Sequence, residues 1–343
     1  MDRGAELGRP TLVPLGLIGP HEPPGATTVG TVSAPPTSAL ASSQPPVTGP
    51  MERLRSWSRG ILIANLVAQI VIVATGGAVR LTASGLGCSA WPQCEPGHFT
   101  PAHFQAASYH AAVEFGNRTI TGALLIVSVL VALVVWTDRS RARSYRVLGL
   151  VPLVGVVLQA VIGGIAVLVR LNPAIVSSHM LISMALVAVS TLLLRRSVEG
   201  DARARPEVDG TLVAVARALA VATIVVLALG VVVTGAGPHS GDAEVGYRFD
   251  VDPATMARAH SLAVWVFLVL LVILVVGLAR SPSQPRARRA AQVLLATTLV
   301  QGVIGYVQFF TGLPALLVGV HMTLAALLAA ATTWFVTSLR SRD

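Results

Sequence analysis

Four histidines and one glutamate stand out because they lie in long apolar segments, where ionisable side chains are rare. Such residues are candidates for function, since a charged group inside a membrane-spanning segment is energetically costly. The neutral imidazole nitrogen is a ligand for haem iron, which takes one imidazole on each face. A carboxylate in the same place can accept or relay protons. The residues are His110, Glu114, His179, His260 and His321.

These residues belong to eight apolar stretches that approach or exceed the roughly 20 residues a helix needs to cross a bilayer. The chain is 53% hydrophobic and only 12% charged over 343 residues, which excludes an ordinary soluble protein of this size. Because backbone polar groups in lipid must bond within their own segment, the stretches are expected to be helices. The sequence therefore predicts an all-α integral membrane protein with eight transmembrane helices, at roughly 61–79, 110–136, 147–169, 173–195, 211–236, 256–279, 289–312 and 314–338.

The net charge of +9 is concentrated in alternate connections between these stretches. Arginine-rich connections stay on the cytoplasmic side, so we expect a multi-pass protein of the cell membrane with both termini cytoplasmic. The charge reports topology and does not indicate a nucleic-acid partner. Under this topology the five residues above lie in the first turns of inward-running helices and share one depth, in the outer half of the bilayer. The arginines are Arg53, Arg55, Arg59, Arg139, Arg141, Arg143, Arg146, Arg195, Arg196, Arg203, Arg205, Arg280, Arg286, Arg288, Arg289, Arg340 and Arg342.

Residues 1–55 are rich in proline, glycine, serine and threonine and lack a periodic apolar pattern. We expect them to form a disordered cytoplasmic tail. The apolar run Leu12–Ile18 is short and follows no basic segment, so no cleavable signal peptide is expected.

The chain contains one pattern twice. Gln159 precedes His179 by as many residues as Gln301 precedes His321, and the segments Gln-Ala-Val-Ile-Gly and Gln-Gly-Val-Ile-Gly begin at the two glutamines. An even number of helices separates the copies, so both have the same orientation, as in a parallel repeat. We predict two parallel-repeat four-helix bundles, at 56–197 and 211–339, joined by a cytoplasmic linker at 198–210.

His260 and His321 lie at matched depth on the sixth and eighth expected helices. A helical bundle can present two such imidazoles to one haem, so they are the predicted axial ligands of a haem in the second half. A hydrogen bond from each histidine to a neighbouring helix is the alternative. Zinc is less favoured, because its usual third and fourth ligands are missing at that level.

The first half differs at one position. The repeat aligns position 117 with the first of these two ligands, within a residue, and the residue there is Asn117. A haem held by His179 alone would keep an open iron position, which oxygen chemistry requires. Glu114 and His110 share a helical face with Asn117, and Glu114 is the candidate proton acceptor or relay. A charge-neutralising pair between Glu114 and Arg118 is the alternative, and it is compatible with that role.

Two cysteines lie in the outer connection after the first expected helix. Cys88 and Cys94 are close in sequence and face an oxidising compartment, so they form either a disulfide or two free thiols. The counterpart connection in the second half carries His239, which either covers a cofactor or is solvated. Three arginines at outer helix ends either meet haem propionates or extend to the membrane surface: Arg80, Arg170 and Arg258.

Together these motifs resemble those of the haem A synthase family. The resemblance covers roughly 58–338 and is carried by the segment Gly76–Cys94, the run Glu114-Phe-Gly-Asn117-Arg118, the loop Gly237–Asp242 and the pairs His179-Met180 and His321-Met322. It implies an enzyme of cytochrome oxidase assembly that converts haem O into haem A. The C8 methyl group of the porphyrin would be oxidised to a formyl group by successive hydroxylations, with molecular oxygen or water as the oxygen source.

The resemblance also implies a role for each half. A haem b cofactor would be held in the second half by His260 and His321, and haem O would bind in the first half beside Glu114 and His179. The family's outer cysteine pair maps onto Cys88 and Cys94. Haem O synthase would be a partner, besides membrane lipid and an electron donor that the resemblance leaves unknown.

One departure from the family pattern concerns the substrate haem. The family has a histidine where this chain has Asn117, so we favour His179 as the only protein ligand of the substrate iron. His110 lies two turns earlier on the same face and is the candidate replacement. At 1.5 Å rise per residue it would lie about 10 Å nearer the surface.

Two other functions are compatible with membrane-embedded histidines. A two-haem electron-transfer subunit of the cytochrome b type would need two complete bis-histidine pairs, and Asn117 breaks one of them. A transporter suits repeated halves with ionisable groups inside the membrane, although the pair of Gly/Pro-broken helices expected there is not obvious.

Overall fold

The computed structural model describes residues 49–101, 109–280 and 284–342. Most of the predicted tail, including the run Leu12–Ile18, lies outside the described residues. Its last residues are described, and the prediction of disorder is wrong there, because helix α1 covers Pro50–Ser56. Proline at the first helical position has a preset φ, and the Glu52 side chain accepts a hydrogen bond from the backbone N–H of Gly49 at 3.3 Å. Both features favour a helix start.

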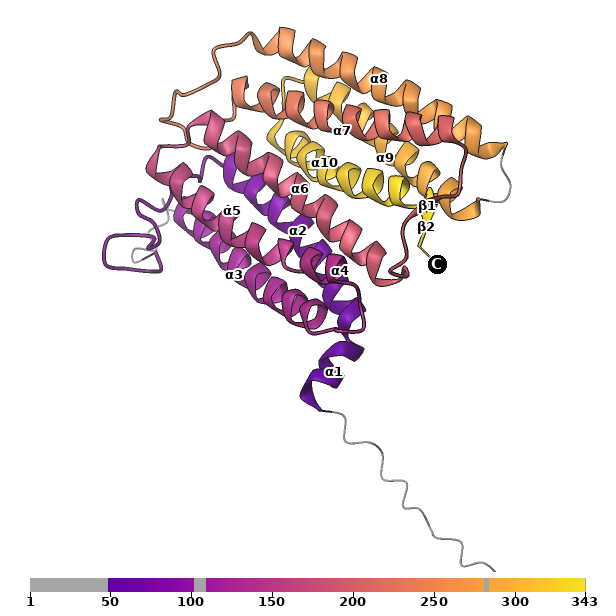
Figure 1. Ribbon diagram of the computed structural model, residues 1–343. Coiled ribbons are helices and arrows are strands. Elements are labelled where there is room, and N and C mark those ends of the chain that lie inside the picture. Colours follow the sequence, from indigo (N-terminus) through magenta and orange to yellow (C-terminus); the bar gives the residue numbers. More distant parts are fainter. Residues whose placement is uncertain (1–48, 102–108, 281–283, 343) are drawn as a thin grey trace, which may run out of the picture. The chain divides into compact units, whose positions relative to one another are not determined.

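Eight spans in the described part of the chain are long and apolar enough to cross a membrane, which confirms the predicted all-α membrane fold (Figure 1). One of the eight consists of two helices in succession. The spans are α2 (Ser58–Leu81), α3 (Tyr109–Trp136), α4 with α5 (Arg143–Leu148 and Val151–Leu168), α6 (Pro173–Ser197), α7 (Gly210–Ala236), α8 (Pro253–Ala279), α9 (Pro285–Phe310) and α10 (Ala315–Thr337).

The third span is interrupted between α4 and α5, which the apolar pattern did not predict. Pro152 is one of the first two residues of α5. Proline has no N–H to offer the carbonyl four residues earlier, and its ring crowds that carbonyl. That carbonyl belongs to Leu148, the last residue of α4. The helix therefore ends there and restarts.

Side-chain caps define where two of the histidine-bearing helices, α6 and α8, begin. The Asn172 side chain accepts a hydrogen bond from the N–H of Ala174 at the start of α6. The Asp252 side chain does the same for Thr255 at the start of α8, and hydrogen bonds from the Thr255 hydroxyl and N–H hold the pKa of Asp252 below its usual value. A cap and a proline at the first position fix the first turn of a helix. His179 and His260 follow within the first eight residues of these helices.

The same helix pairs occur in both parts of the sequence. In 58–197, α2 packs on α3 and α6, and α5 packs on the same two helices; in 210–337, α7 packs on α8 and α10, and α9 packs on the same two helices (Figure 1). Across the halves, α10 contacts α2 as α6 contacts α7, and α6 contacts α10. These pairings are the ones that two parallel four-helix units would give, and they favour the predicted repeat. The repeat and its domain boundaries stay predictions.

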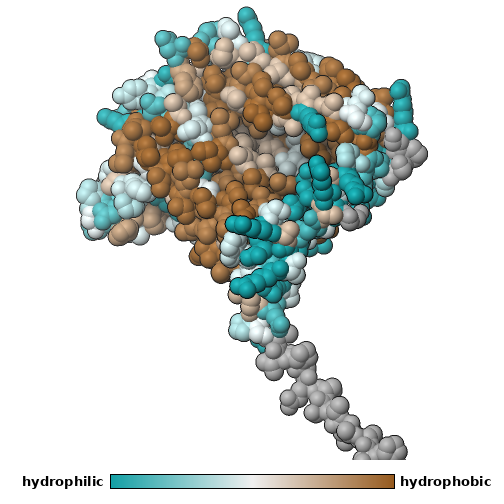
Figure 2. Space-filling model, viewed as in Figure 1, coloured by the Kyte–Doolittle hydropathy of each residue, from teal (hydrophilic) through white to brown (hydrophobic). Residues whose placement is uncertain are grey.

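Apolar side chains fill the interior and also cover the outside of the spans. Between the halves, Val73, Met184 and Ala326 belong to one buried cluster contributed by α2, α6 and α10. Outward side chains are apolar too, and Phe310 and Leu316 are more than three-quarters exposed. Figure 2 shows apolar residues over the middle of the helices and polar ones towards the end near α1. A large exposed apolar surface bounded by polar residues is typical of a lipid-facing protein.

The segment predicted as a linker, 198–210, is attached to the Arg-rich end of the bundle. Strand β1 (Arg205–Pro206) pairs antiparallel with β2 (Arg340–Ser341) after the last helix. Asp201 accepts a hydrogen bond from the Arg141 guanidinium at 2.9 Å, which lowers the pKa of Asp201 to about 2. The segment thus contacts both the residues that follow α10 and the connection between α3 and α4.

Candidate functional site

His260 and His321 face each other within the second half. They come from α8 and α10, and their ring centroids lie 6.5 Å apart with the ring planes at 72°. A metal with imidazole nitrogens on opposite sides at about 2.0 Å each would place the centroids about 6.3 Å apart, since each ring adds a little over 1 Å. An edge-to-face contact of two rings gives similar distances. The centroid distance therefore suits one iron between the rings, and it also suits a direct contact between them. The hydrogen bonds of each ring are needed to distinguish the two arrangements.

The hydrogen bond of the His260 ring leaves a nitrogen ready for metal binding. Its Nδ1 lies 3.0 Å from the backbone carbonyl oxygen of Val226 on α7. Because a carbonyl oxygen only accepts, Nδ1 must carry the proton, and Nε2 keeps the lone pair that a metal binds. In His321 the Nδ1 atom is buried and has no hydrogen-bond partner among the described residues. A hydrogen bond to a neighbouring helix was the alternative to haem ligation for each histidine. His260 has such a bond, and the bond leaves its Nε2 atom available to a metal.

A glutamine and two glycines fix where these rings lie. Gln301 donates through Nε2 to the backbone carbonyl of His321 at 3.0 Å. A Cβ atom at Gly230 would lie 3.0 Å from Cε1 of His260, and one at Gly305 would lie 3.1 Å from Cε1 of His321. A Cβ atom at either position would be tighter than an ordinary van der Waals contact, so the imidazole would have to shift by a few tenths of an ångström to admit a larger residue. The donor set and its support fit a haem held by two imidazoles.

The first half presents His179 in the way that the second half presents His321. Each is the seventh residue of its helix. Gln159 donates through Nε2 to the backbone carbonyl of His179 at 2.9 Å. The Nδ1 atom of His179 is buried, and the described part of the chain offers it no partner. A Cβ atom at Gly163 would lie 3.6 Å from Cε1 of this ring, an ordinary contact distance.

Asn117 lies where the repeat predicts a second imidazole. The Thr75 hydroxyl on α2 donates to its Oδ1 atom at 2.8 Å, so the amide is bound to the first helix of its half, as the corresponding histidine is bound to α7. Within the residues that the structure describes, no hydrogen bond or ring contact joins His179 to Asn117, Glu114 or His110. The first half therefore contains one imidazole and one amide at the two corresponding places.

Glu114 is buried and bound on both carboxylate oxygens. Its Oε2 accepts a hydrogen bond from the backbone N–H of Cys88 at 2.7 Å, and its Oε1 pairs with the Arg118 guanidinium at 2.5 Å. The i, i+4 ion pair considered as the alternative is thus present. Arg118 also donates to the carbonyls of Ala90 and Gln93 at 3.1 and 2.9 Å. Glu114 and Arg118 together anchor the loop between α2 and α3 to α3.

The two cysteines form a disulfide inside that loop. Cys88 and Cys94 are joined by a bond of 2.07 Å, and both are fully buried. Ala111, on the first turn of α3, packs with them in one cluster. The disulfide closes the segment whose N–H and carbonyl groups bind Glu114 and Arg118, so it supports the position of the carboxylate.

The other two candidate histidines interact with outer loops. His110 Nδ1 lies 2.9 Å from the Ser84 hydroxyl oxygen, in the loop after α2. His239 Nε2 lies 3.1 Å from the carbonyl oxygen of Leu313, which precedes α10. His110 is therefore bound to the same loop that holds Glu114, and its predicted role as a replacement ligand stays a prediction.

The three arginines considered for haem propionates differ from one another. Arg80 is half-buried and donates to the carbonyl of Thr234 at 2.9 Å, which joins the end of α2 to the end of α7. Arg170 and Arg258 are exposed. Arg80 is thus the one of the three with a place inside the fold, between the two halves.

Sequence patterns missed the residues that support the candidate ligands. Gly163 and Gly305 carried a signal, because each follows its glutamine by four residues, about one helical turn. Thr75 carried no such signal in the sequence, because the rotation of α2 against α3 decides which side chain contacts Asn117. Ser84 was missed because it lies in the loop after α2, and its contact with His110 depends on how that loop folds.

Comparison with known proteins agrees with the resemblance seen in the motifs. A family model described as cytochrome oxidase assembly protein, COX15-CtaA, matches residues 59–240. The chain is similar to a haem A synthase of Bacillus licheniformis, at 28% identity over 43% of this chain and 48% of that protein. It is also similar to haem A synthases of Bacillus mycoides and Bacillus cereus, each at 30% identity over 42% of this chain and 45% of the relative.

These alignments span about half the length of the curated relatives. The family match covers all helices of the first half and α7, and it ends before α8. It therefore includes Glu114, Asn117 and His179, whereas the His260–His321 pair lies beyond it. Since more than half of the chain matches the family, this chain belongs to the COX15-CtaA family of cytochrome oxidase assembly proteins.

Proposed function

We propose that this protein is a haem A synthase, an oxidoreductase that oxidises the C8 methyl group of haem O to a formyl group. The observation that carries the proposal is the His260–His321 pair, with ring centroids 6.5 Å apart and the Nδ1 proton of His260 held by a backbone carbonyl. The names of the Bacillus relatives support the same activity. The proposal places a haem b cofactor in the second half and the haem substrate in the first.

The second half would serve electron transfer. A haem with two imidazole ligands supplies one-electron oxidation and reduction. His260 and His321 would hold this haem through their imidazole nitrogens. The bond from Nδ1 of His260 to the Val226 carbonyl orients this ring and raises the basicity of the other nitrogen.

The first half would bind the substrate haem through His179. Asn117 offers an amide in place of a second imidazole, and its Oδ1 is bound to Thr75. With one protein ligand, one face of the substrate iron stays open for oxygen chemistry. Two hydroxylations of the methyl carbon followed by loss of water give the formyl group. With molecular oxygen as the source, each hydroxylation inserts one oxygen atom and uses two electrons and two protons to release the other atom as water. With water as the source, each hydroxylation releases two electrons and two protons.

Glu114 would accept or relay the protons that these steps take up or release. Its carboxylate is held by the Cys88 N–H and by Arg118, so its position is fixed before substrate arrives. A positioned carboxylate contributes to catalysis when it reaches the transferred proton directly or through one water. The role assigned to Glu114 requires its carboxylate to lie within hydrogen-bond distance of that proton or of one bridging water.

We place the Arg-rich connections on the cytoplasmic side of the cell membrane, with both termini there, because arginine-rich loops are retained on that side. The disulfide loop then faces the oxidising outer compartment, where disulfides persist. Haem O would reach the first half from haem O synthase in the same membrane, and an electron donor completes the reaction.

Pigment extraction tests the proposed activity. The full-length protein is expressed in cells that lack their own haem A synthase, with and without haem O synthase, and the extracted haems are separated and identified. We expect haem A only when both proteins and oxygen are present. Haem O that accumulates unchanged beside a haem b-loaded protein would contradict the proposed activity. It would favour the two-haem electron-transfer alternative. A purified protein without haem would favour the transporter.

A further inference from the structure

A recess at the Arg-rich end of the bundle lies between the start of α2 and the end of α6. It has a volume of about 180 Å³ and is open to its surroundings. Two arginines and three aliphatic residues line it: Arg59, Ile63, Leu194, Arg195 and Val198. No part of the proposed haem chemistry uses these residues.

The recess carries more positive charge than its neighbours neutralise. Within the described chain, the Arg59 side chain is exposed and has no hydrogen bond or ion pair. Arg195 pairs with Glu199 at 3.5 Å, but the other oxygen of that carboxylate lies 3.8 Å from Arg342. The Nε atom of Arg195 is buried without an acceptor. Two guanidinium groups with free donors in one recess suit an anion with several acceptor oxygens, such as a phosphate.

The aliphatic wall shows what else the ligand must contain. Ile63 lies one turn beyond Arg59 on α2 and is 42% exposed, and Val198 is 61% exposed. Trp57, just before α2, is 72% exposed, as tryptophans at a membrane interface often are. The recess therefore lies where the apolar span meets the charged end, and a free phosphate would leave its aliphatic wall unused.

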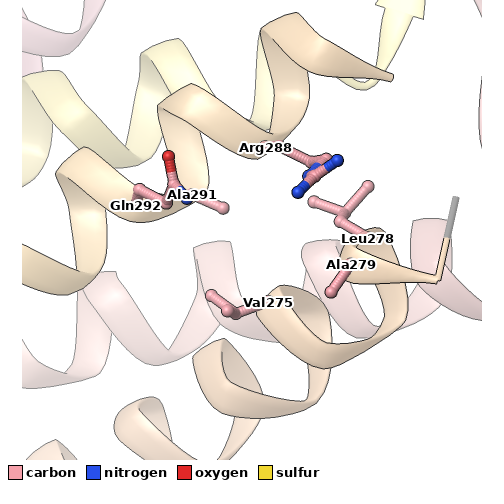
Figure 3. A pocket seen from close by; sticks show the side chains of 6 residues that line it. All are labelled: Val275, Leu278, Ala279, Arg288, Ala291 and Gln292. Carbon is pink, nitrogen blue, oxygen red and sulfur yellow. The ribbon is translucent and has the colours of Figure 1, made fainter. Parts of the chain in front are cut away.

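A second recess, between α8 and α9, offers a comparison within the same molecule. Figure 3 shows the Arg288 guanidinium close to Leu278, with Gln292 and Val275 farther along the two helices. This recess has a volume of about 50 Å³ and contains a single arginine. It has the same mixture of charge and aliphatic wall, but only one guanidinium to bind a phosphate.

We propose that the recess between α2 and α6 binds one anionic phospholipid. Arg59 and Arg195 donate to the phosphate oxygens of the headgroup, and an acyl chain lies along Ile63 and Val198. Basic pockets between transmembrane helices on the cytoplasmic side recognise anionic lipids in this way. The inference does not rest on the proposed oxidation of haem.

Native mass spectrometry of the full-length protein tests this site. The protein in detergent is titrated with phosphatidylglycerol or phosphatidylcholine of identical acyl chains, and the retained lipids are counted. We expect one phosphatidylglycerol to be bound at least about tenfold more tightly than phosphatidylcholine, and Arg59→Gln to lose about that factor, which equals about 1.4 kcal/mol. Arg288→Gln is the matched control, since it removes one arginine from the other recess, and it should leave this binding unchanged.

Three outcomes would overturn the assignment. Undiminished binding in Arg59→Gln and in the double variant Arg59→Gln/Arg195→Gln would show that the lipid lies elsewhere. An equal loss in Arg288→Gln would show a general effect of net charge. Displacement of the lipid by millimolar inorganic phosphate would make the recess a phosphate site. Thermal unfolding in phosphatidylcholine checks that each variant is folded, and Arg59, which has no partner among the described residues, can be tested alone if the double variant fails.

Discussion

In the second half of the chain two imidazoles lie with ring centroids 6.5 Å apart, whereas in the first half His179 has the amide of Asn117 at the position where the repeat expects a partner. The supports of the two sites are otherwise alike. Gln159 and Gln301 each donate to the backbone carbonyl of the histidine twenty residues later. One change of side chain on a similar scaffold thus separates a site suited to a closed, two-ligand haem from a site suited to an open one.

The outer loops of the two halves differ in a related way. The loop of the first half is closed by a disulfide and is bound to Glu114 and Arg118. The loop of the second half is held by Arg248, which donates to the carbonyls of Gly237, Pro238 and Val245. In the first half the loop positions a buried carboxylate about one helical turn before Asn117 on α3, and the structure describes no such carboxylate in the second. This difference supports placing the proton chemistry in the first half.

The largest expected effect is at the closed site. His260→Ala or His321→Ala should abolish the low-spin haem b spectrum of the purified protein. Loss of a supporting residue alone typically lowers metal affinity about 10- to 100-fold, and loss of a ligand should exceed that range. Absorption and electron paramagnetic resonance spectra measure the effect. His239→Ala, which changes a histidine bound to a loop carbonyl, is the control and should keep the spectrum. An unchanged spectrum in either ligand variant would mean that the haem is held elsewhere.

Glu114→Gln should impair the reaction in the first half and leave haem binding in the second half intact. Glutamine keeps an oxygen that can accept from the Cys88 N–H, but it can no longer take up a proton at neutral pH. We expect haem b to be retained and haem A formation to fall by about 100-fold or more, as when a general base is removed. The rate of haem A formation per bound haem b is the measurement. Normal turnover would reduce Glu114 to a structural partner of Arg118.

Asn117→His should make the first half resemble the second. Haem bound there through His179 would gain a second imidazole and change from a high-spin to a low-spin spectrum. Hemin added to the variant is the spectroscopic probe, so the readout does not depend on activity.

Two further variants check the single-ligand interpretation of the first half. Asn117→Ala should leave the spin state of the bound haem unchanged, because in the proposed site His179 is the only protein ligand of the substrate iron. His110→Ala should also leave it unchanged, since His110 is bound to Ser84 in the outer loop. If His110→Ala loses the substrate-haem spectrum, His110 is the second ligand and the contrast between the halves disappears.

Hydropathy predicts which segments enter lipid, and eight spans of that kind are present in the described part of the chain. The direction of the helices, which the arginine pattern predicts, and the shared depth of His179, His260 and His321 stay predictions. Contacts that depend on helix rotation could not be predicted, and the bond between Thr75 and Asn117 is one of them. The bond from the Cys88 N–H to Glu114 was also missed, since it arises only when the outer loop folds back on α3.

Removal of the disulfide is expected to have the smallest effect. It also allows the contributions of the two loops to be compared. Cys88→Ser should lower the free energy of unfolding by about 2 kcal/mol, the value expected for a short closed loop, while haem A formation falls only severalfold. Glu114 would still accept from the N–H of residue 88, and Arg118 would still bind the loop carbonyls. Arg248→Gln is the counterpart in the second half, and it should lower haem b retention more than the cysteine variant does. Thermal unfolding and haem content measure both variants. If Cys88→Ser lost as much activity as Glu114→Gln, the loop would position the carboxylate through the disulfide itself and not through its hydrogen bonds.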